Sequence, residues 1–132
     1  MSQENMDIIR GLYDAFARGD IPAVLGSLDA DVEWREADGF LYADQNPYIG
    51  PGAVLAGVFV RIGGEWEGFQ AKPDSLLDAG ETVIAQGHYS GVYKATGRSV
   101  RAQFAHLFTL RGGKVVRFQQ YTDTKQFAEV TA

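Results

Sequence analysis

Apolar residues recur at two different spacings along the chain, and the change of spacing separates a helical N-terminal part from a C-terminal part made of strands. In the first segment Ile8, Leu12 and Phe16 recur at four-residue intervals, with Ile9 and Ala15 beside them, which is the spacing of one helix face. Asp20 can cap a second helix, because Pro22 follows near its first position. Three helices are therefore expected, over 5–18, over 21–28 and from Pro51 to Gly63.

The rest of the chain alternates between apolar and polar residues, which is typical of strands. Strands are expected over 32–36, 66–77, 82–93, 99–111 and 114–122, with a bulge or edge position at Pro73, and a short helix or tail is expected after Thr122. Gly112-Gly113 predicts a tight hairpin turn. Helices first and an antiparallel meander afterwards indicate an α+β fold of one domain over 1–132, with a curved sheet wrapped around the helices as a cone.

The hairpin around Gly112-Gly113 carries the candidate chemistry. Strand alternation puts His106 on one face with Phe104, Phe108 and Leu110. In the next strand the alternation gives two sets, which are Val115, Arg117, Gln119, Tyr121 and Asp123 on one face and Val116, Phe118, Gln120 and Thr122 on the other. We expect His106, Gln119 and Asp123 to project into one apolar hollow.

The segment 37–50 contains Phe40, Tyr42 and Tyr48 among turn-forming residues. Two interpretations remain open. The rings either pack onto the surface beneath the segment, or the segment is a lid over a pocket.

Composition narrows the classes of function. The net charge of −5 and the absence of a Lys/Arg cluster argue against nucleic acid or an anionic membrane as a partner. With no cysteine there is no thiolate nucleophile or Cys-based metal site, and the two histidines and scattered carboxylates lack metal-ligand spacing. The N-terminal residues do not have the pattern of a signal peptide, and no apolar run reaches membrane-spanning length, so the expected location is the cytoplasm. No metal and no cofactor are expected.

Several segments resemble the NTF2-like superfamily, in its SnoaL-like and ketosteroid-isomerase-like branch. The segments that carry the resemblance are Ala17-Arg18-Gly19-Asp20, Ala30-Asp31-Val32-Glu33-Trp34, Tyr93 with Thr96-Gly97-Arg98, and Gly113-Lys114-Val115-Val116-Arg117-Phe118 with Tyr121-Thr122-Asp123. The resemblance covers nearly the whole chain and implies the cone-shaped fold. It does not imply one activity, because this fold hosts isomerases, cyclases, dehydratases, epoxide hydrolases and binders.

The positions that are catalytic in the family match this chain only in part. The position of the isomerases' Asp base is occupied here by Trp34, and the position of their oxyanion-binding Tyr by Leu12, with Tyr13 adjacent but rotated about 100° around the helix. His106 falls near the position of their neutral Asp donor. The SnoaL-like cyclases carry an acid/base Asp at the end of the last strand, which Asp123 matches, whereas Gln119 replaces their usual Trp.

Asp123 and His106 are therefore the candidate catalytic residues, and each has a plain structural alternative. A buried His can simply satisfy a local hydrogen bond, and Asp123 can cap a helix over 124–130. If both lie on one face, the pair can move protons. The residues expected to bind substrate are Tyr13, Trp34, Phe59, Trp66, Tyr89, Phe104, Gln119 and Tyr121.

The leading hypothesis is a protein that binds a small apolar, oxygenated molecule and performs cofactor-free proton transfer, as an isomerase, cyclase, dehydratase or hydrolase. The alternatives are a small-ligand-binding module without catalysis and a dimeric scaffold with an incidental pocket. A homodimer is expected through the outer face of the sheet, which we predict to carry Val116 and Phe118.

Overall fold

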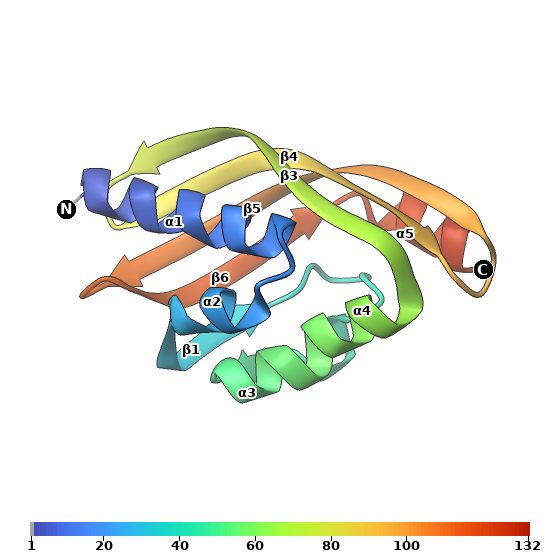
Figure 1. Ribbon diagram of the computed structural model, residues 1–132, viewed down its shortest axis with the longest axis horizontal. Helices are drawn as coiled ribbons and strands as arrows, with labels where there is room; N and C mark the ends of the chain where they lie inside the picture. Colours follow the sequence, from blue (N-terminus) through green and yellow to red (C-terminus); the bar gives the residue numbers. More distant parts are fainter. Residues whose placement is uncertain (1) are drawn as a thin grey trace.

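The structure is a computed structural model that describes residues 2–132, and a curved six-stranded sheet runs through its whole length (Figure 1). The strands are β1 Leu28–Arg35, β2 Tyr48–Ile49, β3 Trp66–Ala79, β4 Thr82–Tyr93, β5 Arg98–Arg111 and β6 Lys114–Thr122. The helices are α1 Ser2–Ala17, α2 Ile21–Gly26, α3 Pro51–Val54, α4 Val60–Glu65 and α5 Thr124–Thr131, with a 3-10 turn over Ala43–Gln45 and a π-helical turn over Leu55–Phe59.

The expected α+β architecture is confirmed. Strands β3 to β6 form an antiparallel meander, and the sheet order is β2-β1-β6-β5-β4-β3. Strand β1 pairs with β6 in parallel, which adds the N-terminal strand to the end of the meander. This strand begins at Leu28, earlier than the expected 32, because Leu28 already pairs with Val115 of β6.

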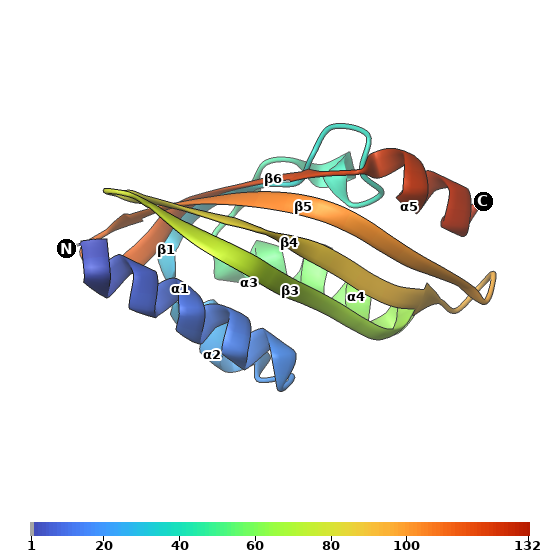
Figure 2. The same ribbon diagram turned by 90° about the horizontal axis from the view of Figure 1, so that it is seen from above.

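The helices cover the sheet unevenly. Helix α1 packs on β3 and β4, α2 packs on α1 and β1, and α3 packs on β1 and β2. Helix α5 packs on β5 and lies at the end of the molecule opposite the N-terminus (Figures 1 and 2). The interior of the cone therefore lies between the sheet and the helices α1 to α4.

Local signals in the sequence explain most element boundaries. Asp20 caps α2 as expected, since its carboxylate accepts a hydrogen bond from the backbone N–H of Ala23. Gly112 and Gly113 have φ of 58° and 79°, the left-handed values that a tight hairpin turn requires. Pro73 lies in edge strand β3 next to a register shift, as predicted.

A one-residue bulge in β6 reverses the faces that simple alternation predicts. Leu110 pairs with Val115 but Thr109 pairs with Arg117, so Val116 is the extra residue. Beyond the bulge Phe118 and Gln120 are buried inside the cone, and they replace the expected inward set. The prediction of Gln119, Tyr121 and Asp123 as inward residues is wrong, and so is the placement of Phe118 on the outer face.

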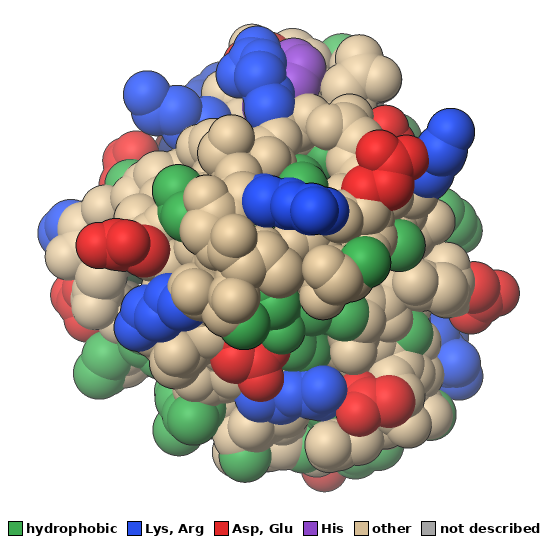
Figure 3. Space-filling model, turned by 90° about the vertical axis from the view of Figure 1, so that its right-hand side faces the viewer, with side chains coloured by type: hydrophobic (Ala, Val, Ile, Leu, Met, Phe, Trp, Pro, Cys, Tyr) green, Lys and Arg blue, Asp and Glu red, His purple; other side chains and the backbone are tan. Residues whose placement is uncertain are grey.

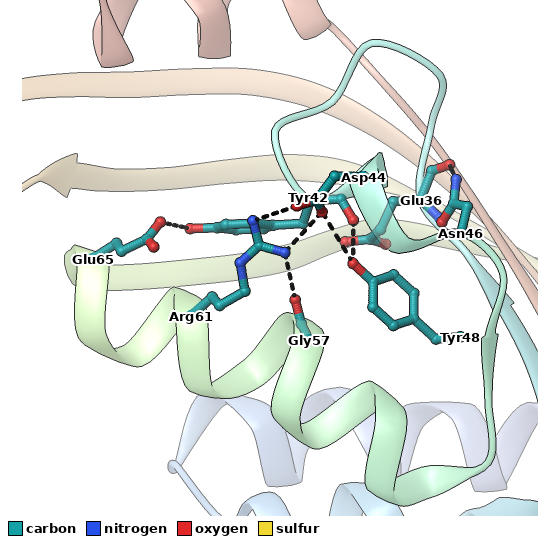
Figure 4. A network of polar contacts seen from close by, with 8 residues as sticks. All are labelled: Glu36, Tyr42, Asp44, Asn46, Tyr48, Gly57, Arg61 and Glu65. Carbon is teal, nitrogen blue, oxygen red and sulfur yellow. Dashed lines mark hydrogen bonds and ion pairs between the residues drawn. The ribbon is translucent and has the colours of Figure 1, made fainter.

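The segment 37–50 is packed down rather than raised as a lid. Phe40, Tyr42 and Tyr48 are all at most 4% exposed. Arg61 on α4 holds the segment through both oxygens of Asp44, at 2.8 and 3.2 Å, and lies over the Tyr42 ring (Figure 4). The rings thus pack onto the surface beneath them, which is the first of the two interpretations.

No helix within residues 2–132 combines the length and the apolar character that crossing a bilayer requires.

Candidate functional site

A mostly apolar chamber lies between the sheet and the helices. Its cavity volume is about 50 Å³. It is small but not filled by side chains. Its lining consists of Leu12, Tyr13, Phe16, Val24, Trp34, Glu36, Val58, Phe59, Ile62, Phe69, Ala71, Tyr89, His106, Phe108, Phe118 and Gln120.

The mouth of the chamber is formed by aromatic and aliphatic side chains. Four lining residues are only half-buried, and these are Phe16, Phe59, Ile62 and Phe69. They come from the end of α1, the α4 region and the start of β3, so the chamber reaches the surface between these elements. At the end of the molecule that carries α4 and α5, apolar side chains gather in a hollow near the centre, with charged side chains around them (Figure 3).

The π-helical turn at Leu55–Phe59 supplies Val58 and Phe59 to this wall. The wider turn continues into α4 without a break. Turns of this kind are frequent at functional sites, where they re-aim side chains.

His106 lies on β5 at the centre of the chamber, 5% exposed, and both of its ring nitrogens are engaged. The Tyr13 hydroxyl lies 2.5 Å from Nδ1, and the Tyr89 hydroxyl lies 2.5 Å from Nε2. The Phe104 ring stacks on the imidazole with 4.0 Å between centroids. Burial among these rings lowers the pKa of His106 to about 3, so the imidazole is neutral at physiological pH.

The two tyrosines are neutral as well. Burial raises the pKa of Tyr13 and that of Tyr89 well above the ordinary value for a phenol. Tyr89 raises the pKa of Tyr13 further, and Glu36 raises that of Tyr89, while the hydrogen bond from Gln120 lowers the pKa of Tyr89 by less than burial raises it. The group formed by these two hydroxyls and the imidazole therefore carries no charge at neutral pH.

Among the described residues that line the chamber, Glu36 is the one acidic residue. It is 3% exposed, and its Oε2 accepts a hydrogen bond of 3.1 Å from the Trp34 indole N–H. Burial raises the pKa of Glu36 to about 8, against smaller lowering effects of that hydrogen bond and of the charge on Arg61. At neutral pH most molecules therefore hold Glu36 as the uncharged acid, and the carboxylate is accessible at slightly higher pH.

Two side-chain amides fix the backbone that carries Glu36. The Asn46 side chain accepts from the Glu36 N–H at 2.9 Å and donates to the Glu36 carbonyl at 2.7 Å (Figure 4). On the following residue, the Ala37 N–H donates to Gln120 Oε1 at 3.0 Å. The carboxyl group is thus held at the end of β1 by residues of the 37–50 segment and of β6.

The structure brings five of the expected site residues together. His106, Tyr13, Trp34, Phe59 and Tyr89 all line the chamber.

Two further expected residues are buried next to residues of the chamber but do not line it. Phe104 is buried against His106 and Tyr89. Trp66 is buried outside the lining, where its indole N–H donates to the Tyr42 hydroxyl at 3.1 Å and its ring contacts Phe127.

The other three expected residues lie on the outer side of the sheet. Asp123 is exposed and caps α5, accepting from the Gln126 backbone N–H, which is the structural alternative noted from the sequence. Tyr121 is 54% exposed, and Gln119 is half-buried on the same side. The expectation that Asp123 and His106 share one hollow is therefore wrong, and its cause is the bulge at Val116.

Glu36 and Gln120 are the site residues that the sequence analysis missed. Glu36 lies two positions after Trp34, so strand alternation already placed the two on one face. Gln120 lies directly opposite His106 in the β5–β6 pairing. Predicting that Gln120 points inward required knowledge of the bulge at Val116, and no glycine, proline or other turn residue marks that bulge in the sequence.

Within residues 2–132, no three His, Asp or Glu side chains converge in a way that could hold a metal ion.

Comparisons with known proteins agree with this fold. The family model of the SnoaL-like domain matches residues 9–118. An NTF2-like protein from Burkholderia thailandensis has 38% identity and a TM-score of 0.91, covering 96% of this chain and 95% of its own. An NTF2-like protein of unknown function from Burkholderia pseudomallei has 29% identity and a TM-score of 0.88, covering 98% of each chain.

A more distant structure shares the fold alone. TerC, co-crystallised with polyporic acid, has 23% identity and a TM-score of 0.84, covering 96% of this chain and 97% of its own. No curated protein matches the chain in sequence. The chain belongs to the SnoaL-like domain family and has the NTF2-like fold.

Proposed function

We propose that the protein binds a small, mostly apolar, oxygen-containing molecule in the chamber and transfers a proton on it without a cofactor. The observation that carries the proposal is Glu36, a buried carboxyl with a pKa near 8 that lines the same small chamber as the Tyr13–His106–Tyr89 group. A carboxyl poised near working pH suits general acid–base catalysis. TerC, which has the same fold, was crystallised with a small organic molecule, and this supports the ligand class.

In this proposal Glu36 moves the proton and the tyrosine–histidine group holds the oxygen. The Glu36 carboxylate takes a proton from the carbon next to a carbonyl group, and the electrons of the broken C–H bond move onto the carbonyl oxygen. A hydroxyl of the group donates a hydrogen bond to that oxygen, in a dry site where such a bond is stronger than in water. Return of the proton to the same or another carbon completes an exchange or an isomerisation.

The residues expected from the sequence take modified roles. His106 orients the two hydroxyls instead of transferring the proton itself, because its pKa near 3 keeps it neutral. Trp34 and Phe59 contact the ligand as walls, while Asp123 and Gln119 have no part in the proposal because they lie outside the chamber.

Proton exchange on a small ketone tests the proposal. Cyclopentanone in D₂O is incubated with the protein between pH 6 and 10, and loss of its α-proton signal is followed by NMR. We expect exchange above the buffer rate, rising with pH through a midpoint near 8 as Glu36 ionises, and absent in Glu36→Gln. Glu81→Gln, at an exposed glutamate outside the chamber, is the matched control and keeps the wild-type rate. A Glu36→Gln variant as fast as the wild type would overturn the proposal.

The second candidate is a binding module without catalysis. It is favoured by the neutral His106, whose two ring nitrogens contact tyrosine hydroxyls, and by the small volume of the chamber. Saturable binding of cyclopentanone without exchange in the wild type would select this candidate.

We also propose that two copies pair through the outer face of the sheet. The support is a row of partly apolar side chains there, made of Ile84, Ala105, Leu107, Gln119 and Tyr121, which neighbour one another across β4, β5 and β6. This set replaces the predicted Val116 and Phe118.

A further inference from the structure

A chain of hydrogen bonds connects the backbone beside Glu36 to Tyr13 on α1. It runs from Ala37 N–H to Gln120 Oε1 at 3.0 Å, and from Gln120 Nε2 to the Tyr89 hydroxyl at 2.8 Å. It continues from the Tyr89 hydroxyl to His106 Nε2 and from His106 Nδ1 to the Tyr13 hydroxyl, each at 2.5 Å. All four side chains are buried.

One end of this chain has a fixed direction. The Ala37 N–H can only donate, so it must face the amide oxygen of Gln120. The amide nitrogen of Gln120 then faces Tyr89 and donates to the phenolic oxygen. Tyr89 therefore already accepts one hydrogen bond before its contact with His106 is considered.

Tyr13, His106 and Tyr89 together carry one more proton than the two contacts between them can use. A neutral imidazole and two hydroxyls carry three protons, but only two contacts join them. One proton is left over, and the direction of the chain decides which residue holds it.

Two arrangements are possible. If Tyr89 donates to Nε2, then Nδ1–H donates to Tyr13, and the Tyr13 hydroxyl proton is left over. If Nε2–H donates to Tyr89, then Tyr13 donates to Nδ1, and Tyr89 accepts two bonds while its own proton has no partner. Only the first arrangement makes every bond run head to tail, so that each bond polarises the next.

We infer that His106 is the Nδ1–H tautomer and that the Tyr13 hydroxyl presents the left-over donor to the chamber, so that the site takes the carbonyl oxygen of its ligand at Tyr13. This inference rests on the proposed function for the ligand, but the tautomer follows from the hydrogen-bond chain alone. Gln120 is a positioning residue here, because it sets the direction of the chain without lying at its end.

The tautomer is tested on the unliganded protein. The chain has two histidines, so protein labelled with ¹⁵N-histidine gives signals from His88 and His106 alone. The His106 signals are those that persist in the variant His88→Gln, which changes a residue on the outer side of the sheet. We expect long-range ¹⁵N–¹H spectra at neutral pH to show a protonated Nδ1 and an unprotonated Nε2. A proton on Nε2 would overturn the inference.

The positioning role of Gln120 has a spectroscopic test. Gln120→Met keeps the approximate size of the side chain but removes its donor and acceptor, so nothing sets the direction of the chain. We expect a mixture of the two His106 tautomers in this variant. A pure Nδ1–H tautomer would show that Gln120 does not set the direction.

The ligand part is tested by binding two probes of the same shape. Cyclopentanone has an acceptor oxygen, whereas methylenecyclopentane has a CH₂ group in its place. Tyr13→Phe should weaken cyclopentanone binding by about tenfold, the size of one hydrogen bond, and leave methylenecyclopentane binding unchanged. Tyr93→Phe, outside the chamber lining, is the matched control and changes neither.

The outcomes separate the two claims. Equal binding of cyclopentanone by wild type and Tyr13→Phe overturns the ligand part of the inference and leaves the proposed function standing. Failure of both probes to bind the wild type overturns the proposed function and the ligand part of the inference, while the NMR spectra still decide the tautomer.

Discussion

Glu36 and His106 are buried in one chamber, and burial shifts their pKa values in opposite directions. The pKa of Glu36 rises from 4.5 to about 8, and that of His106 falls from 6.5 to about 3. Both shifts keep the groups uncharged, because burial disfavours the charged form and outweighs the opposing effects of Trp34 and Arg61 on Glu36. The pair therefore makes the stability of the protein depend on pH in two separate ranges.

The sign of each dependence follows from proton binding. Between pH 6.5 and 8 only the folded state keeps the Glu36 proton, so stability falls as pH rises. Between pH 4.5 and 3 only the unfolded state binds a proton at His106, so stability falls as pH decreases. From pH 4.5 to 6.5 the two effects cancel, because unfolding releases one proton from Glu36 and binds one at His106.

We predict a stability plateau between about pH 4.5 and 6.5 that falls on both sides. Each decline extends over about 1.5 pH units, which corresponds to a loss of about 2 kcal/mol in the free energy of unfolding. Urea unfolding measured from pH 3 to 9 checks this. Glu36→Gln should lose the alkaline decline, and its acid decline should begin near pH 6.5 because no Glu36 proton opposes that of His106. An alkaline decline of equal size in both proteins would contradict the assignment to Glu36.

At the level of the elements, two of the four glycines in the helix from α3 to α4 lie in opposite environments. Gly57, in the π-helical turn, lies against the Tyr48 ring, and an added Cβ would overlap ring atoms. At Gly52, in α3, an added Cβ would meet no described atom within 4 Å beyond the neighbouring residues and the backbone of its own helix. One helix therefore provides both a test position and its control.

Gly57→Ala should destabilise the protein by about 1–3 kcal/mol, the usual cost of overpacking. Gly52→Ala should be neutral or stabilise it by up to about 1 kcal/mol, because alanine is the better helix former. Chemical denaturation of the two variants gives both values. Equal effects would mean that the Tyr48 ring does not press on this turn.

The ion pair between Arg61 and Asp44 attaches the 37–50 segment to α4 (Figure 4). Asp44 is 54% exposed, so the pair should contribute only about 0.5–1 kcal/mol to global stability. Its local effect should be larger, since Arg61 also lies over the Tyr42 ring. We expect Arg61→Ala to speed proteolytic cleavage within 37–50, while Arg10→Ala, which breaks an exposed pair on α1, should not. Unchanged cleavage would show that the buried rings alone hold the segment.

Local sequence patterns predicted the helices and strands, but the bulge at Val116 made the predicted inward residues of β6 wrong. Helix spacing and turn glycines gave α1, α2 and the β5–β6 hairpin because these depend on neighbouring residues. The inward set of β6 depends on Val116, whose extra position arises from pairing with β5 and leaves no mark in the sequence. His106 and Tyr89 were placed correctly because β4 and β5 pair without an irregularity.

At the scale of the whole molecule, the row of partly apolar side chains on the outer face of the sheet leads us to expect that two copies pair. We predict a dimer by sedimentation at micromolar concentration, and dissociation in Leu107→Glu, which places a charge in the outer row. Val60→Glu introduces the same charge at a residue that is 59% exposed on α4 and should leave the dimer intact. A monomeric wild type would refute the prediction.

The borders of the sheet limit how copies can assemble. One border strand, β2, is only two residues long. The other, β3, has one register shift between Glu67 and Gln70 and a second between Pro73 and Ser75. Neither offers the straight row of free N–H and C=O groups that strand-by-strand growth into fibrils requires. Association between folded copies is therefore restricted to contact through side chains, and a single charged substitution should be enough to abolish it.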